Sequence, residues 1–235
     1  MEKTYEIYPK SERRRTCIHE AAHAIIYSLA GIPIDRIGVR PQNTVDWKWI
    51  SRRGVCRVVN GIVESSAGHS AVFPVAYWSN DECSWNVDKN AYKNQVQQKS
   101  ELFGSVKSRK KYLFEEKQRL CADVCGLLAG PIADDILDNV PVGKIQLSAD
   151  CIDNYETNDL NTAEAYCTLI SRSGRVARVI DDLTAQTETL LRTPEVWDQV
   201  IKLADNLEVK GILGETENIA GLPEPIVGWP VRKNY

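Results

Sequence analysis

Apolar and polar positions along the chain follow two different patterns. From residue 11 to 30, and through most of the chain after residue 108, apolar residues recur every three or four positions, which is typical of amphipathic helices. Between these stretches, short runs rich in valine and isoleucine have the pattern of strands. The pattern predicts helices over residues 11–30, 89–102, 109–137, 158–171, 175–192 and 194–206, and strands over residues 36–40, 55–63 and 70–77.

Residues at the ends of these segments support the helix predictions. Ser11 is a suitable N-cap for the first helix, and Gly31 and Pro33 are typical of its end. Pro131 predicts a break or a restart within the 109–137 helix. Together the elements predict an α+β, predominantly α-helical fold, in which a small sheet lies next to the first helix and a helical C-terminal bundle follows.

The composition narrows the class of protein. The chain has 235 residues, of which 43% are hydrophobic and 26% charged, and its net charge is −3. These values are typical of a globular protein with a hydrophobic core, exclude a disordered chain, and give no reason to expect a nucleic-acid partner. No apolar run reaches the roughly 20 residues of a membrane helix, and the polar N-terminus lacks a signal-peptide pattern. Seven cysteines without a C-x-x-C pair favour reduced thiols, so we expect a cytoplasmic protein without a membrane span.

Two of the three histidines lie in one short motif, His19-Glu20-Ala21-Ala22-His23. Helical residues four apart differ by only about 40° around the axis, so both imidazoles can bind one metal ion. Glu20 would point toward the open side of the metal, where it could accept a proton from an attacking water molecule. Three histidines placed at random produce this motif in roughly one of several hundred shuffled chains, which favours a metal site over chance.

A catalytic zinc ion needs a third protein ligand and one open position. No third histidine follows at the spacing known from zinc peptidases, because Leu29 occupies that position. His69, the one remaining histidine, is expected at the surface, with a place in the substrate site as the alternative. A carboxylate is therefore expected. The candidates lie just before and at the start of the 158–171 helix, where each of them could instead stabilise the helix N-terminus. They are Asp150, Asp153, Glu156 and Asp159.

Five segments of the chain resemble the peptidase domain of FtsH-type zinc metallopeptidases, in the same order as in that family. The first contains the H-E-A-A-H motif, and the fourth begins with the family's N-D-L sequence. The segments are Thr16–Ile25, Ile34–Pro41, Cys125–Leu137, Asn158–Ala163, and Leu203–Leu207 with the following Gly211–Glu215. The resemblance covers most of residues 11–219 and is weakest between residues 43 and 108.

The resemblance implies a set of site residues. His19, His23 and Asp159 would bind Zn²⁺, and Glu20 would be the general base in the hydrolysis of a peptide bond. In the family the peptide lies extended along an edge strand beside the zinc ion.

The strand after the first helix is the candidate for this peptide-binding edge. The residues expected to bind substrate are Ile37, Gly38 and Val39.

The chain also departs from the family pattern. The family's Gly-Ala-Ser before N-D-L is replaced by Tyr155-Glu156-Thr157, which leaves Asp153 and Glu156 open as alternatives to Asp159. Residues 43–108 are predicted as an insertion within a single domain of residues 1–235, and residues 109–220 as the helical part that carries the third ligand.

The sequence has no G-x-x-x-x-G-K-[ST] phosphate-binding loop. We therefore expect an ATP-independent peptidase that acts on peptides or flexible protein segments. It could form an oligomer or receive substrates from a separate partner. The alternative is a catalytically inactive scaffold of the same fold that binds a peptide or a protein.

Overall fold

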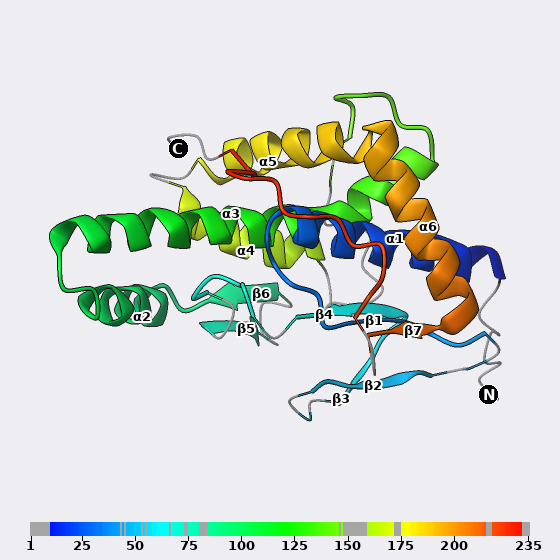
Figure 1. The fold of residues 1–235 in the computed structure, drawn as a ribbon, viewed down its shortest axis with the longest axis horizontal. Coiled ribbons are helices and arrows are strands. Elements are labelled where there is room, and N and C mark those ends of the chain that lie inside the picture. The colour runs from blue at the N-terminus through cyan, green and yellow to red at the C-terminus, as the bar shows by residue number, and fades with distance from the viewer. Residues whose placement is uncertain are drawn as a thin grey trace.

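Six helices and short antiparallel strands make up the part of the chain that the structure describes (Figure 1). The structure is a computed structural model and describes residues 10–231, except 43, 45, 53, 55, 66, 73, 74, 80–83, 146, 148–158, 172–174 and 215–217. The helices are α1 (Lys10–Leu29), α2 (Lys89–Glu101), α3 (Val106–Leu137), α4 (Asp159–Ile170), α5 (Val176–Leu191) and α6 (Pro194–Lys210). The strands are β1 (Arg36–Val39), β2 (Lys48–Ile50), β3 (Cys56–Val58), β4 (Gly61–Glu64), β5 (Ala76–Ser79), β6 (Ser84–Val87) and β7 (Ile212–Leu213). The predicted α+β, mostly helical class is confirmed.

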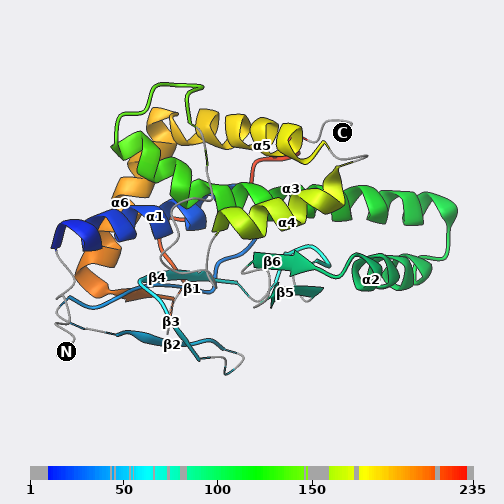
Figure 2. The ribbon, with the colours of Figure 1, turned by 180° about the vertical axis from the view of Figure 1, so that it is seen from behind.

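Helix α1 lies at the centre of the helical layer. It packs against α3 and α6, and both views show it between α3 and the sheet, while α6 crosses α1 and reaches the sheet at β7 (Figures 1 and 2). Nearly all its side chains from Cys17 to Ile26 are buried. Three of them are alanines, and such small side chains let neighbouring elements pack closely against α1. The H-E-x-x-H motif is therefore on the most buried part of the helix.

Strand β1 is the central strand of a three-stranded antiparallel sheet with the order β4-β1-β7. Its Ile37 pairs with Val63 of β4 on one side and with Leu213 of β7 on the other. The sheet lies next to α1, as predicted, and the buried Ile37 and Val39 belong to the main core. On the opposite face, the rings of Trp47 and Trp49 lie against Gly38, where a Cβ atom would overlap both of them.

All six predicted helices are confirmed, and each end that lies in the described residues is within four residues of its predicted position. Ser11 was predicted as an N-cap but lies inside α1, which includes Lys10. The predicted break at Pro131 is wrong, because α3 continues through it to Leu137. A proline inside a helix removes one backbone hydrogen bond, here the one to the carbonyl of Leu127, and the tightly packed surroundings of α3 tolerate this loss.

The strand predictions are confirmed only in part. The 36–40 strand is β1, whereas the 55–63 segment forms two strands, β3 and β4, in different sheets. The 70–77 strand is wrong at residues 70–72 and 75, and the strand β5 begins at Ala76. The backbone N–H groups of Ser70 and Ala71 donate instead to the carboxylates of Asp123 and Glu116 on α3. Side-chain acceptors take the place of a partner strand here.

Residues 43–108 contain β2 to β6, α2 and the start of α3. That this segment is an insertion stays a prediction. None of the helices in the described ranges is long and apolar enough to cross a membrane.

Candidate metal centre

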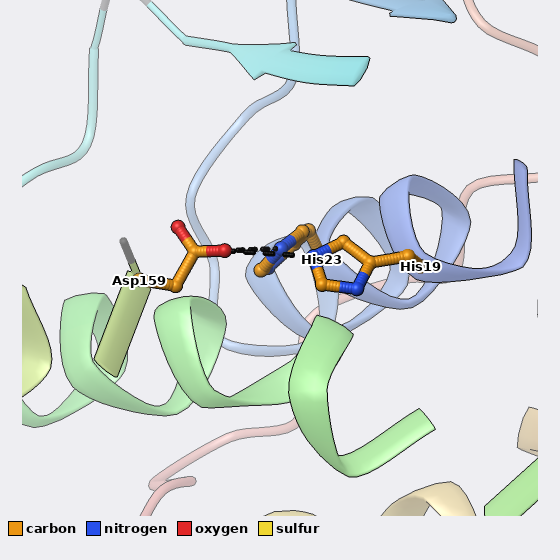
Figure 3. A group of neighbouring side chains, drawn as sticks. All are labelled: His19, His23 and Asp159. Carbon is orange, nitrogen blue, oxygen red and sulfur yellow. Dashed lines mark ion pairs between the residues drawn. The ribbon is translucent and has the colours of Figure 1, made fainter. Parts of the chain in front are cut away.

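Three side chains from two helices meet at one point (Figure 3). His19 and His23 extend from the same face of α1, and Asp159 is the first residue of α4. One ligand atom from each lies within 4.8 Å of the other two. Within the described residues this is the group of His, Cys, Asp and Glu side chains that could hold a metal ion.

The distances from Asp159 to the two histidines fit a tetrahedral zinc site. Asp159 Oδ2 lies 3.5 Å from His19 Nε2 and 3.2 Å from His23 Nε2. Zinc–nitrogen and zinc–oxygen bonds of about 2.0–2.1 Å in a tetrahedron place neighbouring ligand atoms about 3.3 Å apart. Two histidines and one carboxylate are also an established ligand set for a catalytic zinc ion, which keeps the fourth position open.

Hydrogen bonds on the far side of each imidazole hold both rings in place. His23 Nδ1 donates to the backbone carbonyl of Gly126 at 2.7 Å, and His19 Nδ1 lies 2.7 Å from Asp134 Oδ2. Arg15 Nε forms an ion pair with the other oxygen of Asp134 at 2.8 Å. With the proton on Nδ1, the lone pair of each Nε2 is directed toward Asp159, which is the tautomer that a metal requires.

Gly130 of α3 provides the space for the two imidazoles. A Cβ atom at this position would overlap the Nε2 atoms of both His19 and His23. Gly126, one turn earlier, lies against the ring of Tyr27 in the same way. The two glycines therefore allow α3 to approach α1 closely enough for the Gly126 carbonyl to reach His23.

The charges around the cluster favour a cation. Burial alone would raise the pKa of Asp159, but the neighbouring His23 and His19 bring it well below its usual value. Burial alone would lower the pKa of both histidines, yet nearby carboxylates, among them Asp159, raise it above the usual value. Positive charge is thus stabilised at the point where the three side chains meet, which is a condition for binding a metal ion.

Glu20 lies beside the cluster and is itself buried, with 7% of its surface exposed. Its carboxyl group packs over Gly61 of β4, where a Cβ atom would overlap it. Burial is the main reason why the pKa of Glu20 is raised to about 7. A carboxyl group with such a pKa can both accept and release a proton near neutral pH.

The cluster opens into a cavity of about 650 Å³. His19, Glu20, His23 and Asp159 all line it, together with residues from β4, from the β2–β3 hairpin and from α3. A cavity of this size is large enough for several residues of an extended peptide.

The predicted substrate-binding strand is not the one that borders the cavity. Ile37, Gly38 and Val39 are in the central strand β1, whose two edges are both paired, and none of them lines the cavity. The continuous run of residues 60–65, which includes β4, lines it instead. Strand β1 is therefore not an edge strand, and the edge strand next to Glu20 is β4. Which residues bind substrate stays a prediction. The hydrophobic pattern identified both strands but could not show which of them lies at the edge.

His69 is partly buried rather than fully exposed, contrary to the expected surface position. It lines the same cavity, and its Nδ1 lies 2.6 Å from a carboxylate oxygen of the buried Asp123. Its ring also contacts that of Tyr27, edge to face. No sequence motif surrounds His69, so its partner on α3 was not evident.

Sequence reasoning also assigned no role to Gly126, Gly130 or Asp134. The three are spaced by four residues and so lie on one face of α3. This four-residue spacing in the sequence indicates a shared helix face, but it does not show that this face packs against the H-E-x-x-H motif. Asp150, Asp153 and Glu156, the other candidate ligands, lie outside the described residues.

Comparison of the chain with models of known protein families and with curated proteins gives no match. The function is therefore argued from the geometry of the site.

Replacing Asp159 tests the ligand set. We expect Asp159→Ala to lower the affinity for zinc by at least about 100-fold, because it removes a charged ligand from the cluster. Competition with a chromophoric zinc chelator measures the affinity. Asp153→Ala and Glu156→Ala are the matched controls and should change it by less than a few-fold. A larger loss for either control than for Asp159→Ala would exclude this ligand set.

Gly130→Ala tests the packing that makes room for the histidines. The added methyl group would overlap both Nε2 atoms, so zinc affinity should fall by about 10- to 100-fold. Gly104→Ala is the control, because a Cβ atom there meets open space. Circular dichroism would verify that both variants are folded. A folded Gly130→Ala protein with wild-type zinc affinity would contradict the proposed position of the ligands.

Proposed function

We propose that the chain is a zinc-dependent, ATP-independent metallopeptidase that hydrolyses peptide bonds in peptides or flexible protein segments. The observation that supports this most strongly is the position of Glu20. Its buried carboxyl group lies between the three-residue cluster and an edge strand, in one cavity. A site that only held a metal for stability would not need an acid–base group at this point.

The residues present fit zinc, as judged by the type of ligand and the distances between the ligand atoms. Zinc would act as a Lewis acid on the peptide carbonyl and would lower the pKa of the attacking water. His19, His23 and Asp159 would hold it, and the hydrogen bonds to Asp134 and Gly126 would keep the histidines in the required orientation.

Glu20 is proposed as the general base and then the general acid. Its carboxylate would accept a proton from water and, once protonated, donate it to the leaving amine. With a pKa of about 7, it can perform both steps near neutral pH. Gly61 allows the carboxylate to lie at this position, because a side chain there would overlap Glu20 above β4.

Strand β4 is proposed to bind the peptide by adding it as a further strand to the sheet. The N–H of Arg40, just after β1, donates to the carbonyl of Asn60, just before β4. Hydrogen-bonded and non-hydrogen-bonded pairs alternate along antiparallel strands, so the backbone groups of Ile62 and Glu64 also face β1. The backbone groups of Gly61 and Val63 then point to the open edge. A peptide bound there would lie next to Glu20 and the metal cluster.

The described cysteines fit the proposed cytoplasmic location. Among the cysteines that the structure describes, none forms a disulfide, and all but Cys56 are buried: they are Cys17, Cys56, Cys121, Cys125 and Cys167. Oligomerisation and a partner that delivers substrates remain part of the proposal, and no contact in the structure bears on them.

Glu20→Gln tests the enzymatic proposal. The variant cannot take up the proton, so hydrolysis of an unfolded protein such as casein should fall by about 10²- to 10⁴-fold. Zinc content, measured by atomic absorption, should stay at the wild-type level. Glu195→Gln, at the exposed start of α6, is the matched control and should retain full activity.

Two outcomes would contradict the proposal. A Glu20→Gln protein as active as the wild type would exclude Glu20 as the base. Zinc-loaded wild-type protein that is as inert as the variant on several unfolded substrates would instead favour the inactive, peptide-binding scaffold.

A further inference from the structure

A helical arm extends from the body of the molecule. It consists of α2 and the first part of α3, residues 89–119, which lie side by side at the end of the molecule away from α6 (Figures 1 and 2). Tyr92 is buried and fixes α2 to the core. The turn between the two helices, residues 102–105, is at the outer end of the arm.

Large apolar side chains are exposed at this outer end. Leu102 and Val106 flank the turn and are 83% and 70% exposed. Phe103, Leu113 and Phe114 are also exposed, by 40% or more. Single exposed apolar residues are common on protein surfaces, whereas several grouped at one end of the molecule are typical of an interaction site.

The outer end has a defined shape. The Ser105 side chain caps α3 by accepting a hydrogen bond from the N–H of Ser108. Arg109 Nε donates to the carbonyl of Phe103, and the Phe103 ring stacks on Tyr112 with the ring centres 5.1 Å apart. The turn thus holds Leu102 and Val106 outward on an ordered support.

The arm is basic although the chain is acidic. Residues 89–119 contain nine Lys or Arg and three Glu, a net charge of +6, against −3 for the whole chain. Near the turn, Lys99, Lys107, Arg109, Lys110 and Lys111 are all exposed. Exposed basic and exposed apolar residues therefore alternate along the chain around the turn.

We propose that the arm docks on the surface of an anionic lipid bilayer. A surface of this kind presents negative charge to the basic residues and, just beneath it, an apolar layer for Leu102 and Val106. A nucleic acid would satisfy the charge, but it offers no apolar layer to aliphatic side chains. The proposal does not depend on the peptidase activity. With the proposed peptidase activity, membrane docking would bring the enzyme close to substrates at the membrane surface.

Vesicle flotation with the full chain tests the proposal. The protein should float with vesicles that contain phosphatidylglycerol and not with vesicles of phosphatidylcholine alone, and added salt should weaken the binding. Lys107→Gln/Lys110→Gln should reduce binding about 25-fold, since each basic residue near such a surface contributes about fivefold. Leu102→Ser/Val106→Ser should reduce it by more than about tenfold.

Matched controls separate a local effect from a general one. Lys48→Gln/Lys202→Gln removes the same charge from exposed positions outside the arm, and Val142→Ser/Val209→Ser removes exposed valines elsewhere. Both should bind as the wild type does. Equal binding to the two kinds of vesicle, or to neither, would overturn the proposal. Arm variants that bind vesicles as the controls do would also overturn it. If sedimentation without vesicles showed instead that the arm variants abolish self-association of the chain, the arm would be an interface between copies and the proposal would be overturned.

Discussion

The close contact between α1 and α3 is the constraint on which the candidate site depends. Two glycines of α3 make it possible, because a side chain at Gly130 would overlap both motif histidines and one at Gly126 would overlap Tyr27. Through this contact α3 supplies the acceptors for both Nδ1 atoms, the Gly126 carbonyl and Asp134. Without it the imidazoles would have neither a fixed tautomer nor a fixed direction. The metal centre is therefore a product of helix packing as much as of the motif itself.

The site combines groups that are far apart in the sequence. The motif brings the two candidate ligands and the proposed base, and α4 adds a carboxylate about 140 positions later. Strand β4 adds an open edge and, at Gly61, the space for Glu20. Burial of Glu20 between helix and sheet raises the pKa of its carboxyl group toward neutrality. These parts share one cavity, and this coincidence is what favours hydrolysis over simple metal storage.

Local patterns predicted the helices well and the sheet poorly. The helices have periodic apolar faces, so their positions could be predicted closely, although Pro131 suggested a break that the packing of α3 does not show. Strand order depends on distant pairing, so the pattern could not show that β1 is central and β4 is the edge. The same limit applied to His69, whose partner Asp123 is 54 residues away. The motif residues were found because their chemistry is local, on a single helix.

The most direct test of the metal centre is the anomalous diffraction of zinc-soaked crystals at the zinc absorption edge. The expected result is a single strong peak between Nε2 of His19, Nε2 of His23 and Oδ2 of Asp159, next to the Glu20 carboxyl group. A peak at another cluster, such as His69 with Asp123, or a zinc ion bound by Asp153 or Glu156 in place of Asp159, would contradict it.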